Sequence, residues 1–316
     1  MSRAVNVLLT CVGRKSYLVG ILENSSRLGT LVAVDSDQDA TIQYHAPRFE
    51  VVPKVVSDPD AYLDALLDLC ERRSIDCVIP QNDLDLVELA DARDRFTKRG
   101  ILLAGASSDV TRAVRDKLRM VDWMEEHDLP YPKTWKASEA PAEELPAIVK
   151  SRLGQGSARL ERASEPSDLE GLDDREVVVQ RMVDGTEYNL DILRTKEGRV
   201  VSVVPKRKLE MRWGATHKAE SIDSDELIDL GIRVGQATGH VGSIDVDVMI
   251  SERTGESWVI DINPRVGGGF PFTSHFCPEY VDALLAICGG EEPAAFLGDY
   301  RPDVRVDREF RYFECS

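Results

Sequence analysis

The sequence predicts an α/β protein whose C-terminal part changes to α+β organisation. Two patterns predict this fold class. Residues 1–106 alternate short apolar runs with segments of helical periodicity, which indicates parallel strands covered by helices. After residue 130, strand-like runs follow one another around Gly-containing turns, which is typical of antiparallel sheets. The 316 residues, of which 42% are hydrophobic, are enough for several subdomains with sizeable cores.

The N-terminal part contains five apolar runs that we expect to form a parallel sheet. The clearest helix between them begins at Asp58-Pro59, because Pro suits the first helical position, and an apolar stripe follows at Tyr62, Leu66 and Leu69. The expected strands are residues 6–12, 30–36, 49–55, 76–81 and 101–106, and the expected helices are residues 17–28, 58–73 and 83–100.

The rest of the chain begins with a helical segment that Pro130 ends. Beyond it, strand candidates surround one charged segment, 206–221, whose lack of a clean period predicts a long functional loop. The later expected elements are strands at residues 145–151, 175–183, 187–193 and 199–206, helices at 225–239 and 279–288, and a hairpin at 243–265. We therefore divide the chain into an N-terminal α/β domain (1–107), a helical connector (108–129), a small subdomain (130–185) and a C-terminal antiparallel-sheet subdomain (186–316).

Composition excludes several classes of function. A net charge of −17 disfavours binding to nucleic acid, which depends on a basic surface. The sequence has no apolar stretch of about 18 residues, so we expect no membrane span, and the six cysteines without a C-x-x-C pair suit a reducing cytoplasm. The sequence also lacks H-E-x-x-H and G-x-G-x-x-G motifs, which disfavours a zinc site and a dinucleotide site.

The predicted hairpin at 243–265 carries the strongest chemical signal. Because strand side chains alternate between faces, Asp245 and Asp247 share one face of its first strand, and Asp261 and Asn263 share one face of its second. Paired strands would bring these oxygen atoms to one place, and hard oxygen ligands suit Mg²⁺. The alternative reading is an exposed acidic strand face that ends in an Asn-Pro turn.

The residues after this strand favour phosphate chemistry over the alternative. Arg265 supplies a cation for phosphoryl oxygens, and the run Gly267, Gly268, Gly269 lets backbone N–H groups approach an anionic ligand. A plain flexible turn remains the rival account of the three glycines.

This combination of D-x-N-P-R and G-G-G resembles the ATP-grasp superfamily, and specifically its carbamoyl-phosphate-synthase-like carboxylate–amine ligases. The resemblance implies an ATP-grasp fold, in which residues 1–107 form the pre-grasp domain and residues 130–185 form a lid. It implies that Asp247, Asp261 and Asn263 hold Mg²⁺, with Mn²⁺ as an alternative ion, and that Arg265 contacts the γ-phosphate or the acyl phosphate.

The same resemblance implies the position of the nucleotide. A hinge at residues 180–183, after an apolar strand, would bind adenine through its backbone groups, and Glu187 would bind the ribose hydroxyls. Lysines and a Gly-rich turn would bind and cover the phosphates. The implied ATP-binding residues are Lys117, Lys150, Gly156, Ser157, Gln180, Arg181, Met182, Val183 and Glu187.

Other basic residues are candidates for catalysis and substrate binding. Lys208 and His217, in the expected loop, would neutralise the transferred phosphoryl group or a substrate carboxylate, together with Arg265. The substrate candidates are Arg14, Lys15, Arg212, Gly267, Gly268 and Gly269.

These residues predict an ATP-dependent ligase that activates a carboxylate as an acyl phosphate, releases ADP and lets an amine displace phosphate. The resemblance points to amino acids or small peptides as substrates. The net charge and the lack of a long apolar stretch disfavour nucleic acid and membrane as partners, and a homodimer remains open. Three alternatives remain. One is a bicarbonate-phosphorylating enzyme like carbamoyl-phosphate synthase, the second is a non-catalytic ATP-binding regulatory protein, and the third is a Rossmann-type oxidoreductase.

Overall fold

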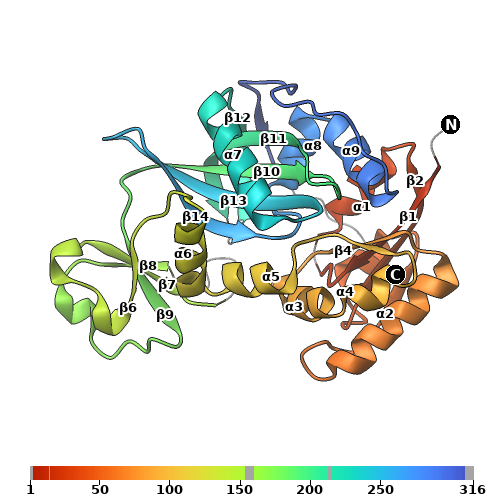
Figure 1. Ribbon diagram of the computed structural model, residues 1–316, viewed down its shortest axis with the longest axis horizontal. Helices are drawn as coiled ribbons and strands as arrows, with labels where there is room; N and C mark the ends of the chain where they lie inside the picture. The colour runs from red at the N-terminus through yellow and green to blue at the C-terminus, as the bar shows by residue number, and fades with distance from the viewer. Residues whose placement is uncertain (1–2, 14, 154–159, 213–214, 310–316) are drawn as a thin grey trace.

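The computed structural model describes residues 3–13, 15–153, 160–212 and 215–309. Its described strands form a parallel sheet, a small antiparallel sheet and a large antiparallel sheet, in that order along the chain (Figure 1). The predicted fold class, parallel α/β followed by antiparallel sheets, is confirmed.

The N-terminal sheet is parallel, with strand order β3-β2-β1-β4-β5. Its strands are buried on both faces: Val7 and Leu9 of β1 belong to one core, and Leu8 between them belongs to another. Parallel sheets require such double covering because their crossover helices lie on both faces. The elements are β1 (Val5–Thr10), α1 (Tyr17–Glu23), β2 (Leu28–Asp35), β3 (Phe49–Val51), α2 (Pro59–Arg73), β4 (Cys77–Pro80), α3 (Asp83–Asp91), α4 (Arg93–Thr97) and β5 (Leu102–Leu103).

Two helices, α5 (Ser108–Arg115) and α6 (Lys117–Glu126), connect this sheet to the next one. They are separated at Asp116, whose side chain caps α6 by accepting a hydrogen bond from the backbone N–H of Leu118. Asp116 also pairs with Arg152 of the small sheet at 2.8 Å. The cap therefore fixes the start of α6 and ties it to the neighbouring sheet.

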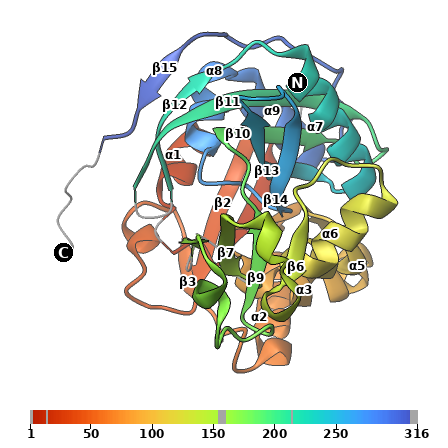
Figure 2. The ribbon, with the colours of Figure 1, turned by 90° about the vertical axis from the view of Figure 1, so that its left-hand side faces the viewer.

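The small sheet has strand order β6-β9-β7-β8. In Figure 1 it stands to one side of the molecule, next to α6, and Figure 2 shows its strands below the large sheet. Its own core includes Ala147, Val149, Val177 and Val179. The strands are β6 (Thr134–Lys136), β7 (Ala147–Ser151), β8 (Leu160–Ala163) and β9 (Val177–Arg181).

The large sheet has strand order β14-β13-β10-β11-β12-β15. Helix α7 packs on one face, while α8 and α9 join the other face to the N-terminal sheet through a shared core that contains Phe270 and Tyr280. The elements are β10 (Gly185–Arg194), β11 (Val200–Arg212), β12 (Ala215–Ser221), α7 (Asp225–Thr238), β13 (Gly242–Ser251), β14 (Ser257–Asn263), α8 (Phe270–Phe276), α9 (Glu279–Cys288) and β15 (Arg305–Asp307).

One element of the sequence prediction is wrong. Residues 206–221 do not form a long loop, because β11 continues to Arg212 and pairs antiparallel with β12 from Ala215 to Ser221. Charged side chains hid the apolar–polar alternation that identifies a strand. They form ion pairs between the two strands, such as Arg207 with Glu220, and within one strand, such as Arg212 with Glu210.

Among the described helices, none is long and apolar enough to cross a membrane.

Candidate active site

The β13–β14 hairpin brings the predicted metal ligands together. Asp247 lies directly opposite Asp261, and Asp245 lies directly opposite Asn263. Directly opposed side chains on one face of an antiparallel pair lie about 5 Å apart at Cβ. The side-chain amide of Asn263 donates to Asp245 Oδ2 at 3.1 Å, so the two strands also meet through their side chains.

A residue that the sequence analysis missed joins the two aspartates of β13. Asn189, on the adjacent strand β10, donates from Nδ2 to Asp245 Oδ1 and Asp247 Oδ1, both at 2.7 Å. Burial and the nearby Asp247 and Asp191 raise the pKa of Asp245 to about 7. The only sequence signal for Asn189 was a polar residue within an apolar strand, and that signal does not reveal its partners.

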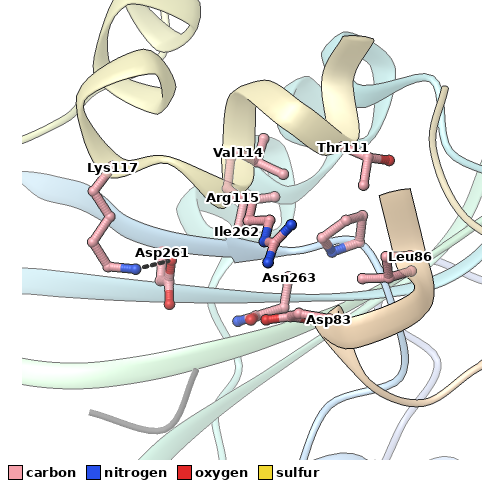
Figure 3. Close-up of a pocket in the computed structure, with 10 residues that line it drawn as sticks. Asp83, Leu86, Thr111, Val114, Arg115, Lys117, Asp261, Ile262 and Asn263 are labelled. Carbon is pink, nitrogen blue, oxygen red and sulfur yellow. Dashed lines mark hydrogen bonds and ion pairs between the residues drawn. The ribbon is translucent and has the colours of Figure 1, made fainter. Parts of the chain in front are cut away.

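Two lysines from separate elements contact the carboxylates of the hairpin. Lys208 on β11 lies 2.7 Å from Asp247 and 2.6 Å from Glu187. Lys117, at the start of α6, lies 3.5 Å from Asp261, as the dashed line in Figure 3 marks. Burial alone would raise the pKa of Asp261, but Lys117, Lys150 and Arg265 lower it below its usual value. Asp261 is therefore held as a carboxylate.

Lys150 connects the small sheet to the hairpin. Its Nζ donates to Gln180 Oε1 at 2.9 Å and to the backbone oxygen of Ile260 at 3.0 Å. Burial, with a contribution from Lys117, lowers the pKa of Lys150 to about 8. Its described hydrogen bonds go to carbonyl oxygens, which leaves its charge available to an anionic ligand.

Arg265 lies between the hairpin and the N-terminal domain. Its guanidinium donates to Asp83 Oδ1 at 2.8 Å and to Asn263 Oδ1 at 3.0 Å. Asn82 caps α3 by accepting a hydrogen bond from the backbone N–H of Leu84, so the carboxylate of Asp83 is free to orient the arginine. Figure 3 shows Asp83, Asn263 and Asp261 along a small cavity that Arg115 and Lys117 also line.

The three glycines differ in their surroundings. A Cβ on Gly267 would lie 2.0 Å from Asp245 Oδ1, and a Cβ on Gly269 would lie 2.8 Å from Lys206 Cε. By contrast, a Cβ on Gly268 would meet nothing within 4 Å. Two glycines thus allow the backbone to pack on the polar side chains of the sheet, and the middle one faces open space.

Alanine substitutions should separate these roles. We expect Gly267→Ala to lower the free energy of unfolding by about 1–3 kcal/mol, because its methyl group overlaps Asp245. Gly268→Ala should leave stability within about 0.5 kcal/mol of the native chain. Urea denaturation of the two variants measures both values, and equal losses would contradict the assignment of the open side to Gly268.

The donor set around the hairpin fits Mg²⁺. Asp247, Asp261 and Asn263 offer hard oxygen ligands, and the buried Oδ1 of Asn189 accepts no hydrogen bond within the described part of the chain. Like-charged carboxylates at this separation need a neighbouring cation, which Lys117 and Lys208 supply in the structure.

Most of the predicted nucleotide residues lie on or directly after β7 and β9 of the small sheet and near the start of β10, while Lys117 begins α6. Gln180 bonds both Lys150 and Thr134, and Glu187 contacts Lys208. Arg181 instead pairs with Glu144 of the small-sheet segment. Met182 and Val183 follow β9 as half-buried residues. Gly156 and Ser157 lie outside the described residues.

The remaining candidates are spread over two regions. Lys15 donates from Nζ to the backbone oxygen of Gln81, where the carboxyl ends of β1 and β4 meet, and burial with Arg265 lowers its pKa to about 7. On the β11–β12 hairpin, His217 Nδ1 lies 3.3 Å from Asp307, and the exposed Arg212 pairs with Glu210. Arg14 lies outside the described residues.

The lowered pKa of Lys150 predicts a pH dependence for nucleotide binding. Lys150 is charged below about pH 8 and loses its proton as the pH rises through that value. We therefore expect affinity for MgADP to fall about tenfold between pH 7 and pH 9, as one charge-assisted hydrogen bond is lost. Lys150→Arg keeps its charge over this range, so an equal decline in that variant by calorimetry would contradict the prediction.

Comparison with known families identifies the class to which this fold and site belong. Residues 114–269 match the model of the ATP-grasp domain, and residues 7–104 match the model of the PylC-like N-terminal domain. The chain therefore belongs to the ATP-grasp family. Members of this family are ATP-dependent carboxylate–amine ligases.

Individual relatives are distant. A carbamoyl-phosphate synthase of Methanobrevibacter smithii is 20% identical over 266 residues, which cover 78% of this chain and 70% of the relative. A carbamoyl phosphate synthase large chain of the same organism is 24% identical, and the match spans only 25% of its length.

Solved structures share the fold. The biotin carboxylase domain of Hydrogenobacter thermophilus 2-oxoglutarate carboxylase, determined with MgADP, ADP and bicarbonate, matches with a TM-score of 0.73 and 16% identity over 96% of this chain and 74% of that one. An L-amino acid ligase from Bacillus licheniformis matches with a TM-score of 0.68 and 17% identity over 91% of this chain and 75% of that one.

Proposed function

We propose that this ligase phosphorylates a small carboxylic acid and joins the resulting acyl group to an amine, with amino acids or small peptides as substrates. The observation that carries the proposal is the convergence of Asp247 and Asp261 with Lys117, Lys208 and Arg265. Such a site aligns and neutralises phosphoryl oxygens, which is most of what phosphoryl transfer requires from a protein.

The metal ligands in this proposal are Asp247, Asp261 and Asn263. Bound Mg²⁺ would neutralise charge on the phosphate oxygens. Lys117 and Lys150 would bind the phosphates from the side of α6 and the small sheet, with Gln180, Arg181, Met182 and Val183 next to adenine and Glu187 at the ribose.

Catalysis would depend on the cations near the carboxylates of Asp247 and Asp261, which we call the carboxylate layer. Lys208 lies beside Asp247, and the carboxylates of Asp247 and Glu187 raise its pKa despite burial, so it remains charged. Arg265, oriented by Asp83, would stabilise the oxygens of the acyl phosphate as the amine attacks. His217 would act at the periphery, on β12.

The arrangement of the chain supports a division into working parts. In this proposal, residues 1–107 form the pre-grasp domain, 108–129 the connector, 130–185 the lid and 186–316 the larger half of the nucleotide site. Lys150 on the small sheet reaches the backbone of Ile260 on the large sheet, which supports a nucleotide site between these sheets. We further propose a cytoplasmic homodimer.

Bicarbonate is the second candidate substrate. The matches to carbamoyl-phosphate synthases favour it, because that name implies phosphorylation of a one-carbon acid. The likeness to an L-amino acid ligase, which covers 75% of that enzyme, supports the amino acid proposal.

A screen for ADP release tests the proposed function. The chain would be incubated with MgATP and pairs of L-amino acids, and separately with bicarbonate and ammonia. We expect ADP formation only with an amino acid pair, and loss of that signal in Asp261→Ala and Arg265→Ala. Undiminished turnover in both variants would refute the site, and ADP release with bicarbonate alone would favour the second candidate.

A further inference from the structure

The backbone oxygen of Gly268 contacts a side chain from the far end of the chain. Arg308, directly after β15, donates from Nη2 to the backbone oxygen of Gly268 at 2.7 Å. Its Cζ lies 5.3 Å from the ring centroid of Tyr17 and 5.6 Å from that of Phe272. Two segments far apart in sequence, one with Tyr17 and one with Gly268 and Phe272, therefore surround the guanidinium of Arg308.

The backbone fixes Arg308 in this position. The N–H of Arg308 donates to the backbone oxygen of His217 at 2.9 Å, and the preceding residue, Asp307, pairs with Lys218 in the β12–β15 ladder. The two aromatic rings stabilise the cation through their electron-rich faces. The side chain of Arg308 would therefore lose little conformational entropy on binding a ligand.

Most donors of this guanidinium have no acceptor in the described part of the chain. Arg265, Lys206 and Lys208 each contact a carboxylate, whereas Arg308 has no carboxylate within ion-pair distance among the described residues. A guanidinium carries five N–H donors in a fork that matches a carboxylate. In a chain of net charge −17, an arginine without a described acidic partner indicates an anionic ligand.

We propose that Arg308, held between Tyr17 and Phe272, binds the carboxylate of the amine substrate next to Gly268. This inference rests on the proposed function, in which an amino acid attacks the acyl phosphate. A carboxylate held at Arg308 is kept away from the metal ligands on β13 and β14 and is not phosphorylated. The amino group of the same molecule then remains available to the acyl carbon.

Thermal shift measurements with a matched control test this subsite. The probes are MgADP with each of the twenty common amino acids and, in parallel, with the corresponding α-amides, which lack the α-carboxylate. The variant is Arg308→Gln. The control is Arg305→Gln, three residues earlier at the start of β15, because Arg305 pairs with Glu220 instead. Arg308→Lys keeps the charge but removes the fork.

We expect at least one amino acid, but not its amide, to raise the melting temperature of the native chain and of Arg305→Gln by a few degrees. Arg308→Gln should lose at least tenfold in affinity for it, and Arg308→Lys should lose less, while MgADP affinity stays within twofold. The proposal is overturned by equal shifts in Arg308→Gln and Arg305→Gln, by no shift with any amino acid, or by a loss confined to MgADP.

ADP release separates this inference from the proposed function. Turnover of an amino acid pair with unchanged substrate affinity in Arg308→Gln would overturn the subsite and leave the ligase proposal standing. A carboxylate-dependent shift without ADP release would overturn the ligase proposal and leave the subsite standing.

Discussion

Lys206→Met is expected to lower the free energy of unfolding by about 3–5 kcal/mol. Lys206 and Asp191 are both 0% exposed and lie 2.8 Å apart, and Lys206 also donates to Thr273 at 2.9 Å. Removal of the ammonium group would leave the Asp191 carboxylate buried without its cation, which is far more costly than loss of an exposed ion pair. The midpoint and slope of urea denaturation measure the change.

A double variant supplies the control for this prediction. Replacement of both partners by apolar residues, in Lys206→Met with Asp191→Leu, removes the uncompensated charge and should recover a large part of the loss. If the single variant lies within about 1 kcal/mol of the native chain, the pair contributes no more than an exposed one, contrary to this prediction.

Arg265→Ala is expected to lower kcat for ADP release by about 100- to 1,000-fold, the usual effect of removing one donor to a developing oxyanion. The affinity for MgADP should change much less, because Lys117 and Lys150 remain. Steady-state kinetics on the best substrate pair, with calorimetry for the nucleotide, measure the two effects.

Asp83→Asn distinguishes a positioning effect from loss of the guanidinium itself. It retains Arg265 but weakens the 2.8 Å ion pair that orients it, so we expect a smaller fall in kcat than in Arg265→Ala. A kcat in Arg265→Ala within twofold of the native value would exclude a role for this arginine in the chemical step.

The strand alternation in the sequence predicted the carboxylate layer well. Period-two spacing is enough to place Asp245 with Asp247 and Asp261 with Asn263, and a short hairpin brings the two pairs together. By contrast, Asn189, Asp83 and Lys206 depend on which strands and domains are neighbours, and that is decided by long-range packing. Spacing along the chain carries no such information.

The error at residues 206–221 has a related cause. In β11 and β12, charged side chains pair across the ladder, so the alternation of apolar and polar residues that identifies a strand is lost. For the three glycines at 267–269, the sequence suggested the correct general property but not which residue has it. Their composition indicated close approach of backbone, but the structure was needed to find that Gly267 and Gly269 pack closely while Gly268 is open.

The position of Asn189 on a central strand has a consequence for hydrogen exchange. Asn189, Asp247 and Asp261 occupy three consecutive strands, β10, β13 and β14, and the β10–β13 pairing runs without interruption from Gly185 to Arg194. Amide protons in such a ladder exchange mainly when the whole sheet opens. On heating, Asn189, Asp247 and Asp261 should therefore stay together until global unfolding.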